Sequence, residues 1–231
     1  MTPEELSEYA YNCDYLAPDS PDSEDRYVVK LVLRATLIFR DGHTPAIREA
    51  LKKCFDEYFS AFGDRLKWGW DPQPASGKPT PRRFDKKLVE STHRAFVNIK
   101  PDGAVLLAFM SGKIENYIDD FGIKCMTATD WEQAIDHDAS YLSFWIPHDM
   151  VQNDKWDNGK FPLDDFLVLC CNRLNAVHGY AGFAIALPHE SHSWEPYWVE
   201  LAEQYYCLEI DNPIITMLMT EGWKGIKGVN W

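Results

Sequence analysis

Several features of secreted, membrane-spanning or metal-binding proteins are missing from this chain of 231 residues. No apolar run approaches the roughly 20 residues that a membrane-spanning helix needs. The first residues, MTPEELSEYA, are acidic, whereas a secretory signal carries a basic segment followed by an apolar one. The six cysteines include no C-x-x-C pair, so we expect free thiols. We therefore expect a cytoplasmic protein that does not bind membranes.

The sequence signatures of common active sites are missing as well. There is no Walker loop, no G-x-G-x-x-G fingerprint and no G-x-S-x-G elbow. His189 and His192 are three residues apart, whereas the helical zinc-protease motif needs a spacing of four. His137 and His148 have aspartate neighbours that could orient a general base, but no recognisable nucleophile accompanies them. The sequence thus predicts no catalytic residues, no metal and no cofactor.

Basic residues are few. Lysine and arginine number 23 against 36 aspartates and glutamates, which gives a formal net charge of −13. Such a surplus of acid argues against direct binding of nucleic acid or anionic membranes, because both are polyanionic. It favours a basic protein as partner, or it serves solubility alone. From the charge, both interpretations stay open.

Hydrophobic periodicity predicts an α+β fold with a mixed, largely antiparallel sheet and helices packed on it. The strands are expected at residues 28–39, 104–110, 141–146 and 181–187, with one or two more within 117–127. Helices are expected at 45–62, 163–177 and 194–206, and a short acidic turn or helix at 127–138.

Two further segments carry local predictions. Residues 67–81 contain four prolines and are expected to form a loop that Trp68 and Trp70 pin to the core. The basic run RRFDKK, residues 82–87, is expected to open a helix that continues to about Arg94. No composition shift marks a linker, so residues 27–231 are predicted to form one domain after a loosely attached acidic lead-in, residues 1–26.

The segment HGYAGFAIALP, residues 178–188, is expected to lie at the centre of the fold. Gly179 and Gly182 flank the start of its apolar run. Glycine beside a buried strand usually indicates a positive φ or a close approach of another segment. We expect one of these at either glycine or at both.

Three stretches in the last third of the chain resemble the VRR-NUC immunity family of type VI secretion systems. They are HGYAGFAI, LEIDNP and GIKGVNW, at residues 178–185, 208–213 and 225–231, and a weaker resemblance extends back to about Val28. The resemblance implies an antitoxin that binds and silences a nuclease effector. Family members continue beyond the equivalent of Trp231, so we expect a short member or a chain truncated at its C-terminus.

An acidic stretch with two aromatic residues is the surface that we expect to contact the effector. A nuclease presents cationic side chains to a polyanion, and a carboxylate-rich surface could occupy its nucleic-acid site. Charge would speed the encounter, and buried aromatic side chains would slow dissociation. This acid–aromatic set comprises Glu115, Tyr117, Asp119, Asp120, Asp130, Trp131, Glu132, Asp136 and Asp138.

The function that follows is inhibition of a cognate nuclease toxin, a basic protein, without catalysis. Only the resemblance selects this function. A small-molecule-binding α+β domain and an enzyme without a recognised motif stay open as alternatives.

Overall fold

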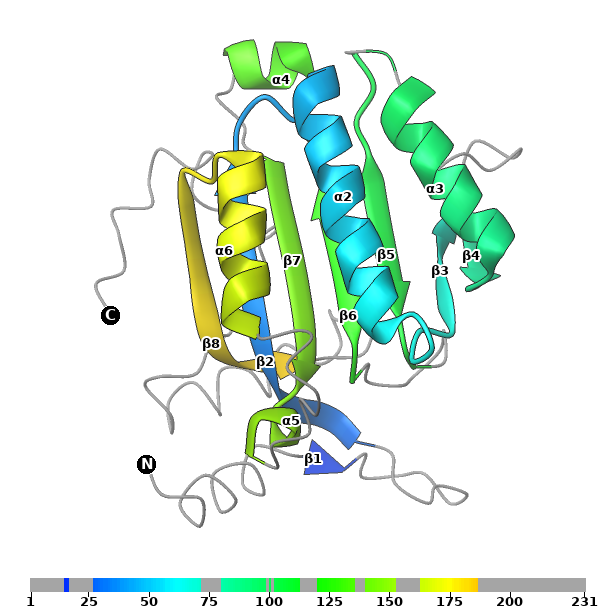
Figure 1. Cartoon of the computed structure of the whole chain (residues 1–231), viewed down its shortest axis with the longest axis vertical. Helices are drawn as coiled ribbons and strands as arrows, with labels where there is room; N and C mark the ends of the chain where they lie inside the picture. The colour runs from blue at the N-terminus through cyan, green and yellow to red at the C-terminus, as the bar shows by residue number, and fades with distance from the viewer. Residues whose placement is uncertain are drawn as a thin grey trace.

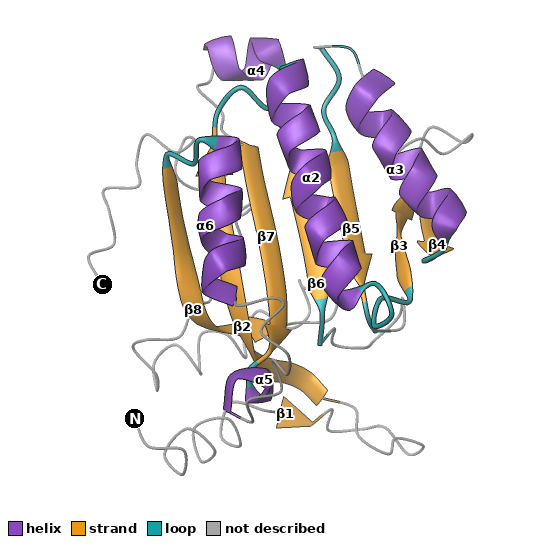
Figure 2. Cartoon of the chain, viewed as in Figure 1, coloured by secondary structure: helices purple, strands orange, loops and turns teal. Residues whose placement is uncertain are grey.

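An antiparallel sheet covered on one face by helices makes up the described part of the chain (Figures 1 and 2). The computed structural model describes residues 15–16, 27–71, 80–98, 100, 102–112, 120–135, 140–152 and 163–186. Every strand pair within these ranges is antiparallel. The α+β prediction is confirmed, and the pairs in the described part of the sheet contain no parallel one.

The sheet is organised around β2 (Tyr27–Phe39). One edge of β2 pairs with β7 and the other with β8, so that Ala35 lies opposite both Phe144 and Ala181. The order of the strands is β8-β2-β7-β6-β5-β3-β4, and β1 pairs with the start of β2. Their bounds are β1 (Tyr15–Leu16), β3 (Trp68–Asp71), β4 (Thr80–Arg83), β5 (Leu106–Met110), β6 (Gly122–Met126), β7 (Ser140–Pro147) and β8 (His178–Ala186).

Three long helices, α2 (Pro45–Phe62), α3 (Lys86–Asn98) and α6 (Leu163–Leu174), lie on the same face of the sheet (Figure 1). Helix α2 begins as predicted, with proline at its first position and the Thr44 hydroxyl accepting from the Ile47 amide at 3.4 Å. Helix α6 ends three residues before the predicted bound, because Asn175 adopts a left-handed conformation with φ 48°. The shorter helices are α4 (Asp130–Ile135) and α5 (Asp149–Gln152). The predicted helix 194–206 lies outside the described residues.

The alternation of side chains in β2 separates two apolar clusters. Leu37 and Phe39 point toward the helices and share the main core with Phe55 and Tyr58 of α2. The Tyr58 hydroxyl, fully buried, donates to the Trp145 carbonyl oxygen at 2.9 Å, so its polar tip is satisfied. On the other face of the sheet, a second cluster collects Val32, Trp68, Ala108, Met110, Trp145, Ala184 and Ala186.

The prediction of one loop for residues 67–81 is wrong at both ends. Strand β3 lies between β4 and β5, and Trp68 is buried in the second cluster, so its role as a pin is confirmed. Gly69 permits this strand, because a Cβ there would lie 2.4 Å from the ring of Phe109. Pro81 is tolerated because β4 is the last strand at this side of the described sheet.

Only the last two residues of the basic run at 82–87 belong to a helix, so the predicted start of this helix is four residues too early. Arg82 and Arg83 belong to β4, and α3 begins only at Lys86. The start is set by Asp85, whose carboxylate accepts from the Leu88 amide at 2.8 Å. Aspartate before an apolar periodic stretch is the signal that locates this helix.

Strand β8 lies at the edge of the described sheet and not at its centre. Within the described ranges it pairs with β2 alone, and Ala181 and Gly182 are exposed. Neither Gly179 nor Gly182 has a positive φ. The alternative expectation, a close approach, is met at Gly179, where a Cβ would lie 2.7 Å from Leu37 Cδ2 and 3.1 Å from the carbonyl oxygen of Thr36.

The two glycines of β8 should therefore respond differently to the same substitution. Gly179→Val should lower the free energy of unfolding by about 1 kcal/mol or more, because its side chain would press on the buried Leu37 and on the backbone of β2. Gly182→Val should be neutral or slightly stabilising, since no atom of the described residues lies within 4 Å of its Cβ position. Urea unfolding of both variants measures the difference, and equal effects would contradict this account of Gly179.

Candidate functional site

The sheet separates the described members of the acid–aromatic set. Asp120 precedes β6, whereas Asp130, Trp131 and Glu132 follow it on α4, so they lie at opposite ends of that strand (Figure 1). The Asp120 carboxylate pairs with Lys30 of β2. The remaining five, Glu115, Tyr117, Asp119, Asp136 and Asp138, lie outside the described residues.

Helix α4 is fixed at its start by a reciprocal pair of caps. The Thr129 amide and hydroxyl both donate to Oε2 of Glu132, at 2.7 and 2.8 Å, and the Glu132 amide approaches the Thr129 hydroxyl at 3.3 Å. This arrangement is a capping box. Glu132 therefore serves α4 itself, and the spacing T-x-x-E in the sequence is the signal that indicates this role.

A side-chain amide joins α4 to the turn between β2 and α2. Oε1 of Gln133 accepts from the Asp41 amide at 2.7 Å, and its Nε2 donates to Oδ1 of Asp41 at 2.7 Å. Asp41 has a φ of 61°, a left-handed conformation that aspartate tolerates better than most residues. Trp131 lies in the sequence between Thr129 and Gln133, which these hydrogen bonds fix, and it is 52% exposed. Asp41 and Gln133 are partners that the sequence analysis missed.

A buried arginine joins the same turn to the loop between α3 and β5. Arg48 is 3% exposed, and burial lowers the pKa of its guanidinium. Nε donates to the Gly42 carbonyl oxygen at 3.2 Å, and one terminal nitrogen donates to the carbonyl oxygens of Lys100 and Gly103 at 3.2 and 2.8 Å. Its charge is thus solvated by main-chain dipoles.

Thr127 connects that loop to the segment that leads into α4. Its amide donates to the Val105 carbonyl oxygen at 2.9 Å, and its hydroxyl accepts from the Val105 amide at 2.9 Å. We call the surface formed by residues 40–44, 102–106 and 127–135 the α4 end. Hydrogen bonds between segments distant in the sequence hold all three parts of it together.

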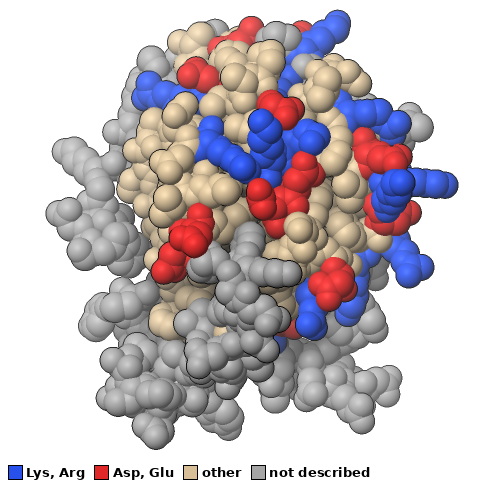
Figure 3. All heavy atoms as spheres, in the orientation of Figure 1, with Lys and Arg blue, Asp and Glu red and all other residues tan. Residues whose placement is uncertain are grey.

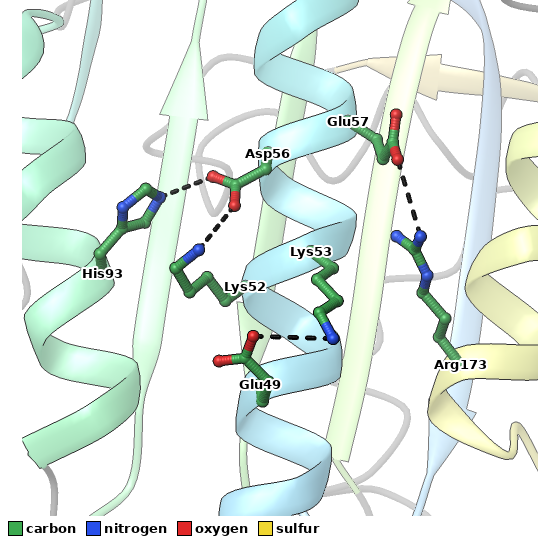
Figure 4. A network of polar contacts seen from close by, with 7 residues as sticks. All are labelled: Glu49, Lys52, Lys53, Asp56, Glu57, His93 and Arg173. Carbon is green, nitrogen blue, oxygen red and sulfur yellow. Dashed lines mark hydrogen bonds and ion pairs between the residues drawn. The ribbon is translucent and has the colours of Figure 1, made fainter.

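The outer surface of the helices carries a second polar network (Figure 4). Asp56 of α2 pairs with Lys52 at 2.8 Å and with Nε2 of His93 on α3 at 2.6 Å, while Glu57 reaches Arg173 of α6 at 3.6 Å. Partly exposed pairs of this kind contribute at most about 1 kcal/mol each. Acidic and basic side chains are interspersed over this face, which is typical of a solvated surface (Figure 3).

The described residues show no arrangement typical of an active site. They contain no group of three or more histidine, cysteine or acidic side chains that could hold a metal ion. His148 is held by the Leu31 carbonyl oxygen, 3.1 Å from its Nδ1, which makes this nitrogen a donor. Burial raises the pKa of the thiols of Cys125 and Cys171. The pKa of the Cys170 thiol is raised by its hydrogen bond with Cys54 and by burial, so none of the three is poised as a nucleophile.

A family model described as type VI immunity for VRR-NUC (TsiV) matches residues 50–231. The solved structure of the Pseudomonas aeruginosa T6SS protein PA0821 is similar, with a TM-score of 0.71 and 25% sequence identity. The similarity covers 93% of this chain and 59% of that one, so this chain spans less than two thirds of its length. Curated proteins yield no match. None of the helices in the described ranges is long and apolar enough to cross a membrane.

Replacing Arg48 by methionine should lower the free energy of unfolding by about 2 kcal/mol or more. The substitution keeps a long apolar stem but leaves three carbonyl oxygens without this donor, one of them on the buried Gly42. The exposed Arg94 of α3 offers a control, because Arg94→Met should change stability by less than about 0.5 kcal/mol. Chemical denaturation compares the two, and a neutral Arg48 variant would show that these contacts do not stabilise the α4 end.

We expect the purified protein to contain no stoichiometric metal. The motivation is the incomplete ligand spacing at His189 and His192, which lie outside the described residues. Elemental analysis after dialysis without chelator checks this. One zinc per chain that is lost on changing His189 or His192 to alanine would contradict it.

Proposed function

Because the chain belongs to the family of type VI immunity proteins for VRR-NUC, we propose that it binds a cognate VRR-NUC nuclease effector and inhibits it by covering its nucleic-acid site. The family match over residues 50–231 is the observation that carries the proposal. The net charge of −13 supports it, since a nuclease site is cationic. The chain acts as a binding protein and not as an enzyme, and it meets the effector in the cytoplasm, where the nucleic acid is.

The distribution of charge along the chain indicates how such binding would work. Acidic and basic side chains are almost equal in number within the described ranges, so the acidic surplus belongs to the rest of the sequence. Net charge acts over about a Debye length, roughly 8 Å at physiological salt, and speeds the encounter. Close contacts then fix the orientation and slow dissociation. The acid–aromatic set supplies both kinds of group and remains our proposal for the contact surface.

The direct test is protection of cells. Co-expression of this chain with the cognate effector should restore growth to the level seen with a catalytically inactive effector. In a binding assay, the association rate should fall as salt rises, while the dissociation rate changes less, because screening weakens long-range attraction. An effector that kills cells containing the folded chain would contradict the proposed function.

Charge reversal tests the contact surface separately. Changing Asp119, Asp120, Asp136 and Asp138 to lysine should slow association with the effector. Since Asp120 pairs with Lys30, the folding of this variant must first be confirmed by circular dichroism. Unchanged association by the folded variant would remove these acids from the contact surface and leave the proposed inhibition intact.

A further inference from the structure

Two exposed apolar side chains belong to the α4 end. Trp131 is 52% exposed and Leu106 is 46% exposed. Leu106 pairs in register with Met126, the last residue of β6, and α4 begins four residues later. A largely exposed tryptophan and an exposed leucine on neighbouring segments are typical of a protein–protein contact.

The α4 end is also preorganised. Arg48 ties the turn after β2 to the loop before β5, Gln133 ties α4 to Asp41, and Thr127 ties the start of α4 to Val105. These bonds fix the backbone around Trp131 and Leu106 before any partner arrives. A surface that is already ordered loses less conformational entropy on binding.

The charges at this end favour a cationic partner. Its exposed acids are Asp41, Asp102 and Asp130, and its exposed base is Arg40. Lys100, also exposed, precedes Asp102 in the loop between α3 and β5. Glu132 adds a partly buried carboxylate. Carboxylates on a surface that also carries an exposed tryptophan repel a phosphate backbone and attract lysine and arginine, so a basic protein surface suits them better than nucleic acid does.

Two other acidic surfaces in the described part of the chain fit such a partner less well. At the opposite end of β6, Lys30 already pairs with Asp120. On the helices, the carboxylates of Asp56 and Glu57 are engaged by Lys52, His93 and Arg173 (Figure 4). A partner would have to break these pairs to use the acids.

We propose that the α4 end is the docking surface for the cationic face of the nuclease effector, with Trp131 and Leu106 as its apolar anchors. The inference rests on the proposed function and narrows it. It places Asp130, Trp131 and Glu132 of the acid–aromatic set at the docking surface and adds Leu106, Asp41 and Asp102 to them.

The test uses the full chain and a catalytically inactive form of the cognate VRR-NUC effector, with rates measured by biolayer interferometry. One variant combines Trp131→Ala with Leu106→Ser, and its control is Val168→Ser on α6, where an equally exposed valine (57%) lies away from the α4 end. A second variant combines Asp102→Lys with Asp130→Asn. Its control, Asp64→Lys with Glu90→Gln, changes the net charge equally on exposed residues elsewhere.

The apolar variant should raise the dissociation rate about tenfold or more, with little effect from Val168→Ser. The charge variant should slow association about threefold or more at low salt, and its control should slow it less. Thermal melts should be unchanged for all four, since every altered side chain is exposed. Wild-type affinity in both α4-end variants would overturn the inference. Failure of the wild-type chain to bind the effector would overturn the proposed function, which separates the two failures.

Discussion

The constraint on which the structure depends is the pairing of β2 on both of its edges. Its partners β7 and β8 follow it by about a hundred residues or more, so the sheet closes only when distant parts of the chain meet. The alternation along β2 then assigns each side chain to a face. Leu37 faces α2 and α6, and Val32 faces the second cluster. Every other element takes its position from this division, including the turn after Phe39 that leads into the α4 end.

Local signals predicted the parts of the fold that local physics decides. Helix α2 has its N-cap, its proline and its apolar period within one continuous stretch, and its bounds agree with the prediction. Strands β3 and β4 were missed because proline and glycine counts suggested a loop. What makes β3 a strand is tertiary, the approach of Gly69 to the Phe109 ring. The edge position of β8 likewise depends on which strands pair. The alternation of side chains along one strand does not show its partners.

The candidate site shows the same limit. The acid–aromatic set comprises residues close in sequence, but one of the strands expected within 117–127 lies between Asp120 and Asp130. Five extended residues span about 15 Å, enough to place the two groups at opposite ends of the sheet. The spacing from Thr129 to Glu132 indicates the capping box of α4. The contact from Gln133 to Asp41 joins positions 92 residues apart, so no local pattern predicts it. The family landmarks, by contrast, pointed to the family that the comparison shows, although 208–213 and 225–231 lie outside the described residues.

The bonds that Arg48 makes have a consequence for how this surface can change. Three of their acceptors are carbonyl oxygens of the main chain, which every amino acid possesses. Substitution at Lys100 therefore leaves the acceptor in place, whereas Gly42 is restricted, since a Cβ there would lie 2.1 Å from Oγ of Ser140. The scaffold of the α4 end is thus largely independent of the side chains displayed on it. When a partner of the α4 end changes its own surface in evolution, single substitutions at Trp131, Leu106 or Asp102 can compensate. The backbone beneath these residues stays the same.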